Sequence, residues 1–246
     1  MFVSAFNIVI HDPLYNALVF LISVVPYADV GIAVILLTVL VKLILFPFAK
    51  QAIETQFTVR KITPELEKIK KEYKDDQQEQ VKRTLALYKE NDIHPLSGFL
   101  VILIQLPIIL GLYWIFFKGG LPQIDVSSLY TFMKAPMEVN MQFLSIVDMG
   151  GKSIVLALLA GATQFIHARI AIVIPEVTTK PGESLKDDLM RSMHIQMKYV
   201  LPVIVGVIAY TISAAVALYW TTSNVFTIVQ ELLVRRSILG KQEYEK

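Results

Sequence analysis

Four long apolar blocks constrain the fold of this chain more than any other feature of its sequence. Three of them, residues 30–48, 99–117 and 153–174, run for 19, 19 and 22 residues with at most one Lys, Arg, Asp or Glu each. A helix needs about 20 apolar residues to cross the hydrocarbon core of a bilayer. Hydrophobic residues make up 54% of the chain and charged residues 18%, so a soluble domain of this length would leave too much apolar surface exposed. The sequence predicts an all-α polytopic membrane protein and excludes an ordinary soluble enzyme.

The fourth block, residues 199–234, is too long for one span. Its 36 residues would form a helix of about 54 Å, well beyond the thickness of the bilayer. Two spans, residues 199–212 and 214–234, joined by a tight turn near Ser213, fit better. We therefore expect five transmembrane helices.

Basic residues give the orientation of these spans. Residues 1–29 contain no Lys or Arg, whereas residues 49–98 contain ten, 118–152 three, 175–198 four and 235–246 four. Cytoplasmic loops collect Lys and Arg. With five spans and an outside N-terminus, 18 of these residues lie inside and three outside. This predicts a multi-pass membrane protein with its N-terminus outside and its C-terminus in the cytoplasm.

The extracytoplasmic N-terminus, residues 1–29, carries a shorter apolar stretch at 14–26. A signal-peptide core is one interpretation, but no basic residue precedes the stretch and no small-residue cleavage site follows it. An amphipathic helix lying flat on the outer membrane surface is favoured, with His11, Asp12 and Asn16 toward the headgroups.

Residues 49–98 are polar but keep a helical spacing of apolar residues, which predicts a cytoplasmic helical hairpin. The Thr-Pro-Glu string at 63–65 is typical of a helix start. Asp76 and Glu79 have the spacing of a capping box and predict the start of the second helix, which should stop near residues 91–95.

The basic residues of this hairpin have two interpretations. One is a solvated face that fixes topology. The other is docking to anionic lipid headgroups, a ribosome or a targeting factor such as the signal recognition particle machinery. The candidate docking residues are Arg60, Lys61, Lys68, Lys70, Lys71, Lys74, Lys82 and Arg83.

Lys42 is the charged residue of the first span and needs an explanation, because a Lys at mid-membrane costs about 2.5–3.5 kcal/mol. It lies six residues before Phe48, so its side chain can also snorkel to the cytoplasmic interface. Other spans carry polar residues too, and a single one of them is best explained by interhelical hydrogen bonding. Taken together they indicate a water-filled cavity between the predicted spans. Because no Asp or Glu lies mid-span, Lys42 is suited to attract an anionic group. The polar residues that accompany Lys42 in the predicted spans are Thr38, Gln105, Thr163, Gln164, His167, Tyr219, Thr221, Thr222, Ser223, Asn224 and Gln230.

Three motifs in order resemble the YidC/Oxa/Alb family of membrane protein insertases, across residues 12–239. The string ILLTVLVKLILFPFAKQ is similar to the first conserved span of that family. The string ALYKENDIHPLSGFLVILIQLPIILGLYWIF is similar to its LYK, NPLxG and QxPI sequence. The string MKYVLPVIVGVIAYTISAAVALYWTTSNVFTIVQELLVRR is similar to its last two spans.

The resemblance implies a non-enzymatic insertase without cofactor or metal, working as a monomer on nascent membrane proteins supplied by a ribosome, with or without the Sec translocon. A hydrophilic segment of the substrate would enter a positively charged groove open to the cytoplasm. Its apolar helix would then leave sideways into lipid. By this resemblance Lys42 takes the place of the family's groove arginine. The candidates for the groove lining are Thr38, Gln105, Gln164, Thr221 and Asn224. Lysine keeps the charge but lacks the planar fork of arginine. The chain resembles the short bacterial form without a large periplasmic domain, which implies a location in the plasma membrane of a prokaryote.

Two other classes of protein stay open as alternatives. A small channel or ion-coupled transporter would be expected to show mid-membrane carboxylates or paired repeats, and neither is found. An intramembrane hydrolase using Ser223 and His167 lacks a supporting motif. The absence of cysteine excludes disulfides and thiolate chemistry, and the four histidines have no metal-ligand spacing.

Overall fold

The structure, a computed structural model, is mostly helical, which confirms the all-α prediction. It describes residues 6–93, 97–116, 121–171, 189, 192–193 and 195–244, so most of the predicted cytoplasmic loop 175–198 lies outside the described residues. The α-helices are α2 (Asp12–Val24), α3 (Val30–Ile44), α4 (Phe46–Glu72), α5 (Gln77–Glu90), α6 (Ser97–Trp114), α7 (Ile154–Ala171), α9 (Leu201–Thr211) and α10 (Ala214–Tyr244). The short helices are η1 (Asn7–His11), η2 (Pro26–Ala28), η4 (Val126–Ser128) and η5 (Gln196–Val200). The described part of the chain has one small antiparallel sheet, β1 (Gln142–Phe143) with β2 (Val147–Asp148).

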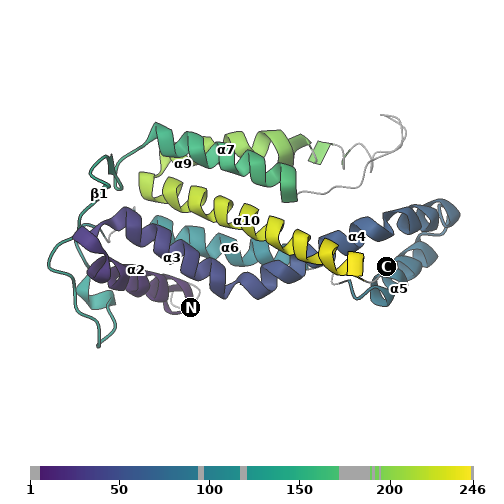
Figure 1. Ribbon diagram of the computed structural model, residues 1–246, viewed down its shortest axis with the longest axis horizontal. Coiled ribbons are helices and arrows are strands. Elements are labelled where there is room, and N and C mark those ends of the chain that lie inside the picture. Colours follow the sequence, from purple (N-terminus) through teal and green to yellow (C-terminus); the bar gives the residue numbers. More distant parts are fainter. Residues whose placement is uncertain are drawn as a thin grey trace.

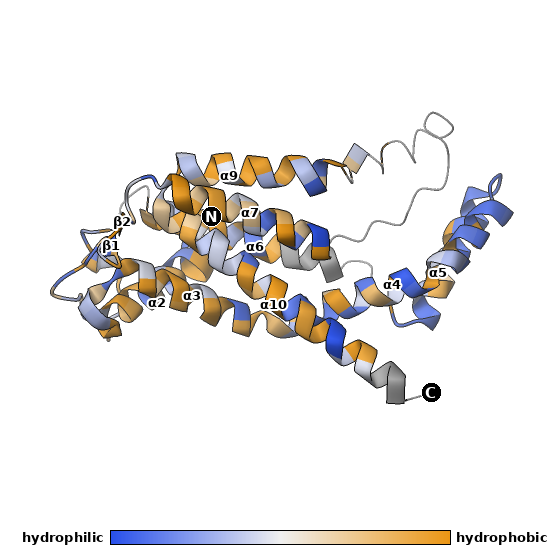
Figure 2. Ribbon diagram, turned by 45° about the horizontal axis from the view of Figure 1, so that its top comes forward, coloured by the Kyte–Doolittle hydropathy of each residue, from blue (hydrophilic) through white to orange (hydrophobic). Residues whose placement is uncertain are grey.

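The helices form an elongated bundle with the loop of β1 and β2 at one end and the α4–α5 pair at the other (Figure 1). Helices α7 and α9 lie side by side on one side of α10, and α3 and α6 lie on the other. The bundle is largely hydrophobic along its length, whereas α5 and the far half of α4 are hydrophilic (Figure 2). The polar pair therefore projects from an apolar body.

Length and composition identify one helix among the described residues that is long and apolar enough to cross a membrane, Asn7–Val24. The bent pair of α3 and α4 passes the same test if it is counted as one span. Three further apolar helices are shorter, at Leu103–Trp114, Ile154–Ile170 and Gln196–Thr211. The five predicted spans and the interfacial position of the N-terminal helix stay predictions.

One apolar core runs through the bundle and receives fully buried side chains from six helices. Leu18 of α2, Val34 of α3, Leu112 of α6 and Ala160 of α7 all lie within it, with 0–1% of their surface exposed. Helices α7 and α9 approach closely at Gly161 and Gly206. A Cβ on Gly161 would lie 3.2 Å from the carbonyl oxygen of Pro202, so a larger residue there would push the helices apart.

The predicted first span is interrupted by a bend of 61° between α3 and α4. The break falls at Leu45, two residues before Pro47, which lacks the N–H that would continue the helical ladder. The predicted helix start at residues 63–65 is wrong. Helix α4 continues through Pro64, and the hydroxyl of Thr63 donates to the carbonyl oxygen of Val59 instead of capping a helix.

Helices α4 and α5 pack through a small core of their own, made by Ile62, Leu87 and Ile93. Asp76 caps α5, because its carboxylate accepts from the backbone N–H of Glu79 at 3.0 Å, as the spacing predicts. At the other end of the chain, α9 ends at Thr211 and α10 begins at Ala214. The break therefore includes Ser213, where the length argument places a turn.

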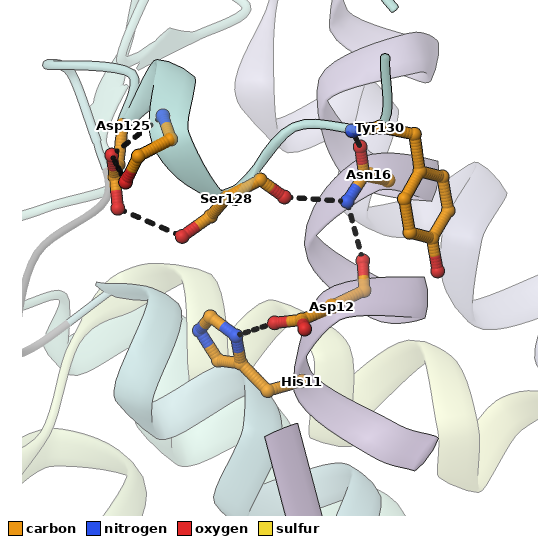
Figure 3. A network of polar contacts seen from close by, with 7 residues as sticks. His11, Asp12, Asn16, Asp125, Ser128 and Tyr130 are labelled. Carbon is orange, nitrogen blue, oxygen red and sulfur yellow. Dashed lines mark hydrogen bonds and ion pairs between the residues drawn. The ribbon is translucent and has the colours of Figure 1, made fainter. Parts of the chain in front are cut away.

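Residues 121–152, here called the capping loop, are held by α2 through a polar network (Figure 3). The Asn16 amide donates to the carbonyl oxygen of Ser128 at 2.9 Å and accepts from the N–H of Tyr130 at 2.7 Å. The hydroxyl of Tyr15 accepts from the N–H of Asp125 at 2.8 Å. Asn16 is 3% exposed, so the prediction that it faces the headgroups is wrong: a loop 112 residues away in sequence satisfies its amide.

Candidate functional site

The centre of the candidate site is the ammonium group of Lys42, in the last turn of α3. It donates to the side-chain oxygen of Gln105 on α6 at 3.3 Å and to the hydroxyl of Thr227 on α10 at 3.1 Å. Gln105 in turn donates through its amide nitrogen to the hydroxyl of Tyr219, which is 3% exposed. Three helices thus meet at one cation through neutral groups.

The charge of Lys42 has no carboxylate partner within ion-pair distance among the described residues. An ammonium has three donors, and two of them are used by Gln105 and Thr227. The third donor has no hydrogen-bond partner among the described residues.

A second polar group lies between α7 and α10. The amide of Asn224 donates to the hydroxyl of Thr163 at 3.3 Å. Asn224 and the neighbouring Gln164 are 5% and 9% exposed. One turn further along α7, His167 has a buried ring nitrogen, Nδ1, without a hydrogen-bond partner. These groups give α10 a polar contact on the side of α7 as well.

The structure brings together only some of the residues predicted for the site. Lys42 and Gln105 are in direct contact, whereas Asn224 on α10 contacts Thr163 on α7, the helix that also carries Gln164. The hydroxyls of Thr38 and Thr221 donate to the carbonyl oxygens four residues earlier in their own helices. Thr38 is 1% exposed, so its side chain lies in the bundle interior.

Sequence reasoning did not select Thr227 and Tyr219 as candidates. Thr227 accepts from Lys42, and Tyr219 accepts from Gln105. Tyr219, Ser223 and Thr227 follow one another at four-residue intervals on α10, which places them along one face. That repeat was the available signal. It was obscured by the other hydroxyl and amide residues of the same helix.

The end of the bundle nearest α4 carries a second charged contact. Arg235 on α10 donates through Nε to Glu231 at 2.8 Å and through Nη2 to the carbonyl oxygen of Ile170 at 2.6 Å. Arg60 on α4 lies near this pair, and its pKa is lowered first by partial burial and then by the like charge of Arg235. Gln230 lies next to Glu231 and donates to the carbonyl oxygen of Phe46 at 3.5 Å, at the bend.

All eight candidate docking residues are exposed on α4, α5 and the turn between them. Two of them are paired on α5: Arg83 and Lys82 contact Glu79 at 2.8 and 3.5 Å. Hydrogen bonding to Arg83 is the main cause that lowers the pKa of the Glu79 carboxyl. Helices α4 and α5 therefore present a basic surface, on which Lys82 and Arg83 form an ion-pair cluster with Glu79.

Comparison with known proteins gives the family. The chain matches the family of the 60Kd inner membrane protein over residues 20–242. It is 30% identical over 216 residues to a membrane protein insertase YidC of Oceanobacillus iheyensis, covering 86% of this chain and 77% of the relative. It is 29% identical to the YidC insertase of Fusobacterium nucleatum, covering 92% of this chain and 97% of the relative.

Other relatives are much longer than this chain. It is 31% identical over 234 residues to the YidC insertase of Actinobacillus pleuropneumoniae serotype 3, of which it covers 38%. It covers 32% of the YidC insertase of Methylobacillus flagellatus. The match extends over nearly the whole described bundle, and it confirms the resemblance carried by the three sequence motifs: the chain belongs to the 60Kd inner membrane protein family, the YidC/Oxa/Alb family of membrane proteins.

Proposed function

We propose that the protein is an insertase that transfers nascent membrane proteins into the bilayer. A hydrophilic segment of the substrate enters a positively charged groove open to the cytoplasm, and the adjoining apolar helix leaves sideways into lipid. The groove is lined by Lys42, Thr38, Gln105, Gln164, Thr221 and Asn224, and we add Thr227 and Tyr219 to this lining.

One observation carries the proposal: Lys42 is a cation inside an apolar bundle, and its partners among the described residues are the neutral side chains of Gln105 and Thr227. Attraction between charges grows as the local dielectric constant falls. An acidic substrate segment supplies the negative charge that the described part of the chain does not place beside Lys42. The names of the relatives support the same activity.

The proposal includes the membrane topology. Five spans cross the membrane with the N-terminus outside and the C-terminus inside. The helix Asn7–Val24 lies at the outer interface and α4–α5 stands in the cytoplasm as a hairpin. The hydrophilic surface of that pair and its exposed basic residues support this orientation. The protein functions as a monomer, and the hairpin docks to the ribosome, to targeting machinery, to the Sec translocon or to anionic lipid.

A crosslinking experiment tests the groove. A photoreactive residue is placed at Ile228, next to Thr227 and partly buried, and a ribosome presents a short single-span protein with an acidic N-terminal tail. A matched control places the same probe at Val203 on α9, which is 66% exposed. We expect tail crosslinks from position 228 that weaken in Lys42→Ala and disappear in Lys42→Glu.

Crosslinks to the tail from Val203 but none from Ile228, in a folded protein, would contradict the groove. A variant that conducts ions without crosslinking any nascent chain would favour the channel alternative. Tail crosslinks that are unchanged in Lys42→Glu would leave an insertase whose capture step is not electrostatic.

A further inference from the structure

The capping loop is attached to the first turns of α3, which carries Lys42, and of α10, which carries Thr227. The N–H of Val30, at the start of α3, donates to the carbonyl oxygen of Asn140 at 3.0 Å. At the start of α10, the N–H of Ala214 donates to Gly151 at 2.8 Å and that of Ala215 to Met149 at 3.1 Å. These N–H groups have no partner within their own helices, so the loop satisfies them.

Asp29 fixes the loop to α3 with both oxygens of one buried carboxylate. It is 4% exposed, and its Oδ1 accepts from the N–H of Ile32 at 3.1 Å, which caps the helix. Its Oδ2 accepts from the N–H of Leu144 in the loop at 2.9 Å. The two contacts use different oxygens of the carboxylate, so they can be separated by substitution.

Helices α3 and α10 start at the same end of the bundle and run in parallel (Figure 1). Lys42 is 12 residues after Val30, and Thr227 is 13 residues after Ala214. At about 1.5 Å per residue these positions lie about 18 and 20 Å from the helix starts. The two side chains therefore reach the same depth, where Lys42 donates to Thr227 at 3.1 Å.

Several of the buried residues near the two helix starts are small, although Val30 and Val216 are buried there as well. Gly31 and Ala33 on α3, and Ala214, Ala215 and Ala217 on α10, offer only shallow ridges for interlocking. Small side chains allow the two helices to approach closely. They restrain the sliding of one helix along the other less well than large side chains do. The loop adds the missing constraint: its Phe143 lies on Gly31, where a Cβ would come within 2.2 Å of the Phe143 ring.

We propose that the capping loop sets the axial register of α3 against α10, and that Asp29 is the positioning residue through which it places Lys42 on Thr227. The importance of Lys42 rests on the proposed function, whereas the register itself does not. A shift of one residue moves a side chain by about 1.5 Å along the axis, which is enough to break a hydrogen bond. The loop thereby acts on the site from about 20 Å away.

The test measures the protection of the Lys42 amine in the full chain in lipid nanodiscs. Acetic anhydride modifies accessible amines, and mass spectrometry quantifies each lysine, with the exposed Lys68 and Lys71 as internal references. Asp29→Asn leaves one acceptor oxygen for two N–H donors, those of Ile32 and Leu144, so the carboxylate can no longer join the loop to the α3 cap. We expect Lys42 modification to rise several-fold, as it does in Thr227→Val, with no change at the reference lysines.

Two further variants complete the design. Gly31→Ala displaces Phe143 without altering any polar group and should raise Lys42 modification in the same way. Met137→Ala changes a fully exposed side chain of the same loop and should leave it unchanged. If Asp29→Asn does not fold, Gly31→Ala alone decides.

Wild-type Lys42 modification in both folded Asp29→Asn and Gly31→Ala, alongside a rise in Thr227→Val, would overturn the register proposal and leave the proposed function intact. No rise in Thr227→Val would also overturn it, because Thr227 would then not hold Lys42. Failure of the proposed function is read separately, from the absence of nascent-chain crosslinks at Ile228.

Discussion

Arg235 and Glu231 form an ion pair of 2.8 Å one turn apart on α10, and the two residues differ sharply in exposure. Glu231 is 2% exposed, whereas the side chain of Arg235 is 24% exposed and also holds the carbonyl oxygen of Ile170. The ion pair thus joins the end of α7 to α10, close to Arg60 on α4. Its two members should not be equally costly to remove.

We expect Arg235→Leu to destabilise the protein by about 2–4 kcal/mol, because it leaves a buried carboxylate without its partner. Glu231→Leu should cost about 1–2 kcal/mol, since Arg235 keeps its bond to Ile170 and can reach water. Thermal unfolding in detergent gives the order, and the double variant should cost less than the sum. Equal losses for both single variants would contradict the asymmetry.

Lys42→Arg should preserve insertion of a substrate with an acidic tail, and Lys42→Ala should reduce it by about tenfold, which corresponds to about 1.4 kcal/mol. Insertion of a matched substrate with a neutral tail should change much less. Protease protection of the tail in proteoliposomes measures both. The same loss for both tails would mean that Lys42 acts on folding rather than on capture.

The contact between Asn224 and Thr163 should contribute about 0.6 kcal/mol, the average for hydrogen bonds between membrane helices. A double-mutant cycle with Asn224→Ala and Thr163→Ala, read by thermal unfolding, isolates this coupling. Thr222→Ala is the control, because its hydroxyl bonds only to Leu218 in its own helix. Coupling above about 2 kcal/mol would exceed what a hydrogen bond in the membrane supplies.

Asp125 in the capping loop should titrate below an unstructured Asp, whose pKa is about 3.9. The hydroxyl and N–H of Ser127 and the hydroxyl of Ser128 donate to its carboxylate, and the resulting stabilisation of the charged form lowers its pKa. The contribution to loop order is therefore present above pH 4 and lost as the pH falls through the lowered value. Carboxyl carbon NMR shifts give the midpoint, which should rise in Ser127→Ala. A midpoint at or above 3.9 in the unmodified chain would contradict this account.

Ile62→Ala should loosen the α4–α5 pair without unfolding the bundle. Ile62 is 4% exposed in a core that it shares with Leu87 and Ile93, so its truncation should cost about 2–4 kcal/mol locally. Limited proteolysis should then cut within residues 46–93 faster, while α7 and α9 stay intact. Val81→Ala, an exposed change on α5, provides the control.

Helix boundaries were predictable where a local signal sets them. Asp76 caps α5 by accepting from the N–H of Glu79, three residues later in the sequence. The break at Ser213 follows from the length of the apolar block. The start predicted at residues 63–65 failed because α4 is already under way at Phe46, and Thr63 then bonds to the preceding turn. Propensity at one site cannot show that a helix has begun 17 residues earlier.

Contacts between distant segments were the part that the sequence did not reveal. Nothing near Asn16 indicates that its amide serves a loop 112 residues later. Lys42 and Gln105 were selected for their chemistry, and the structure brings them together, but Thr227 required knowledge of how α3 and α10 are aligned. Residue type predicts candidates for a polar site, and axial alignment decides which of them meet.

The bend at Leu45 has an electrostatic consequence for Lys42. Because α3 ends at Ile44, Lys42 lies in a final turn, where the carbonyl ends of the peptide units concentrate partial negative charge. Pro47 contributes no N–H to that ladder, so the bend keeps these oxygens from being fully engaged. A helix end of this kind stabilises a cation by about 0.3–1 kcal/mol, and by up to about 2 kcal/mol when partly buried. By ending α3 within a turn of Lys42, the bend therefore lowers the electrostatic cost of keeping a cation at this position.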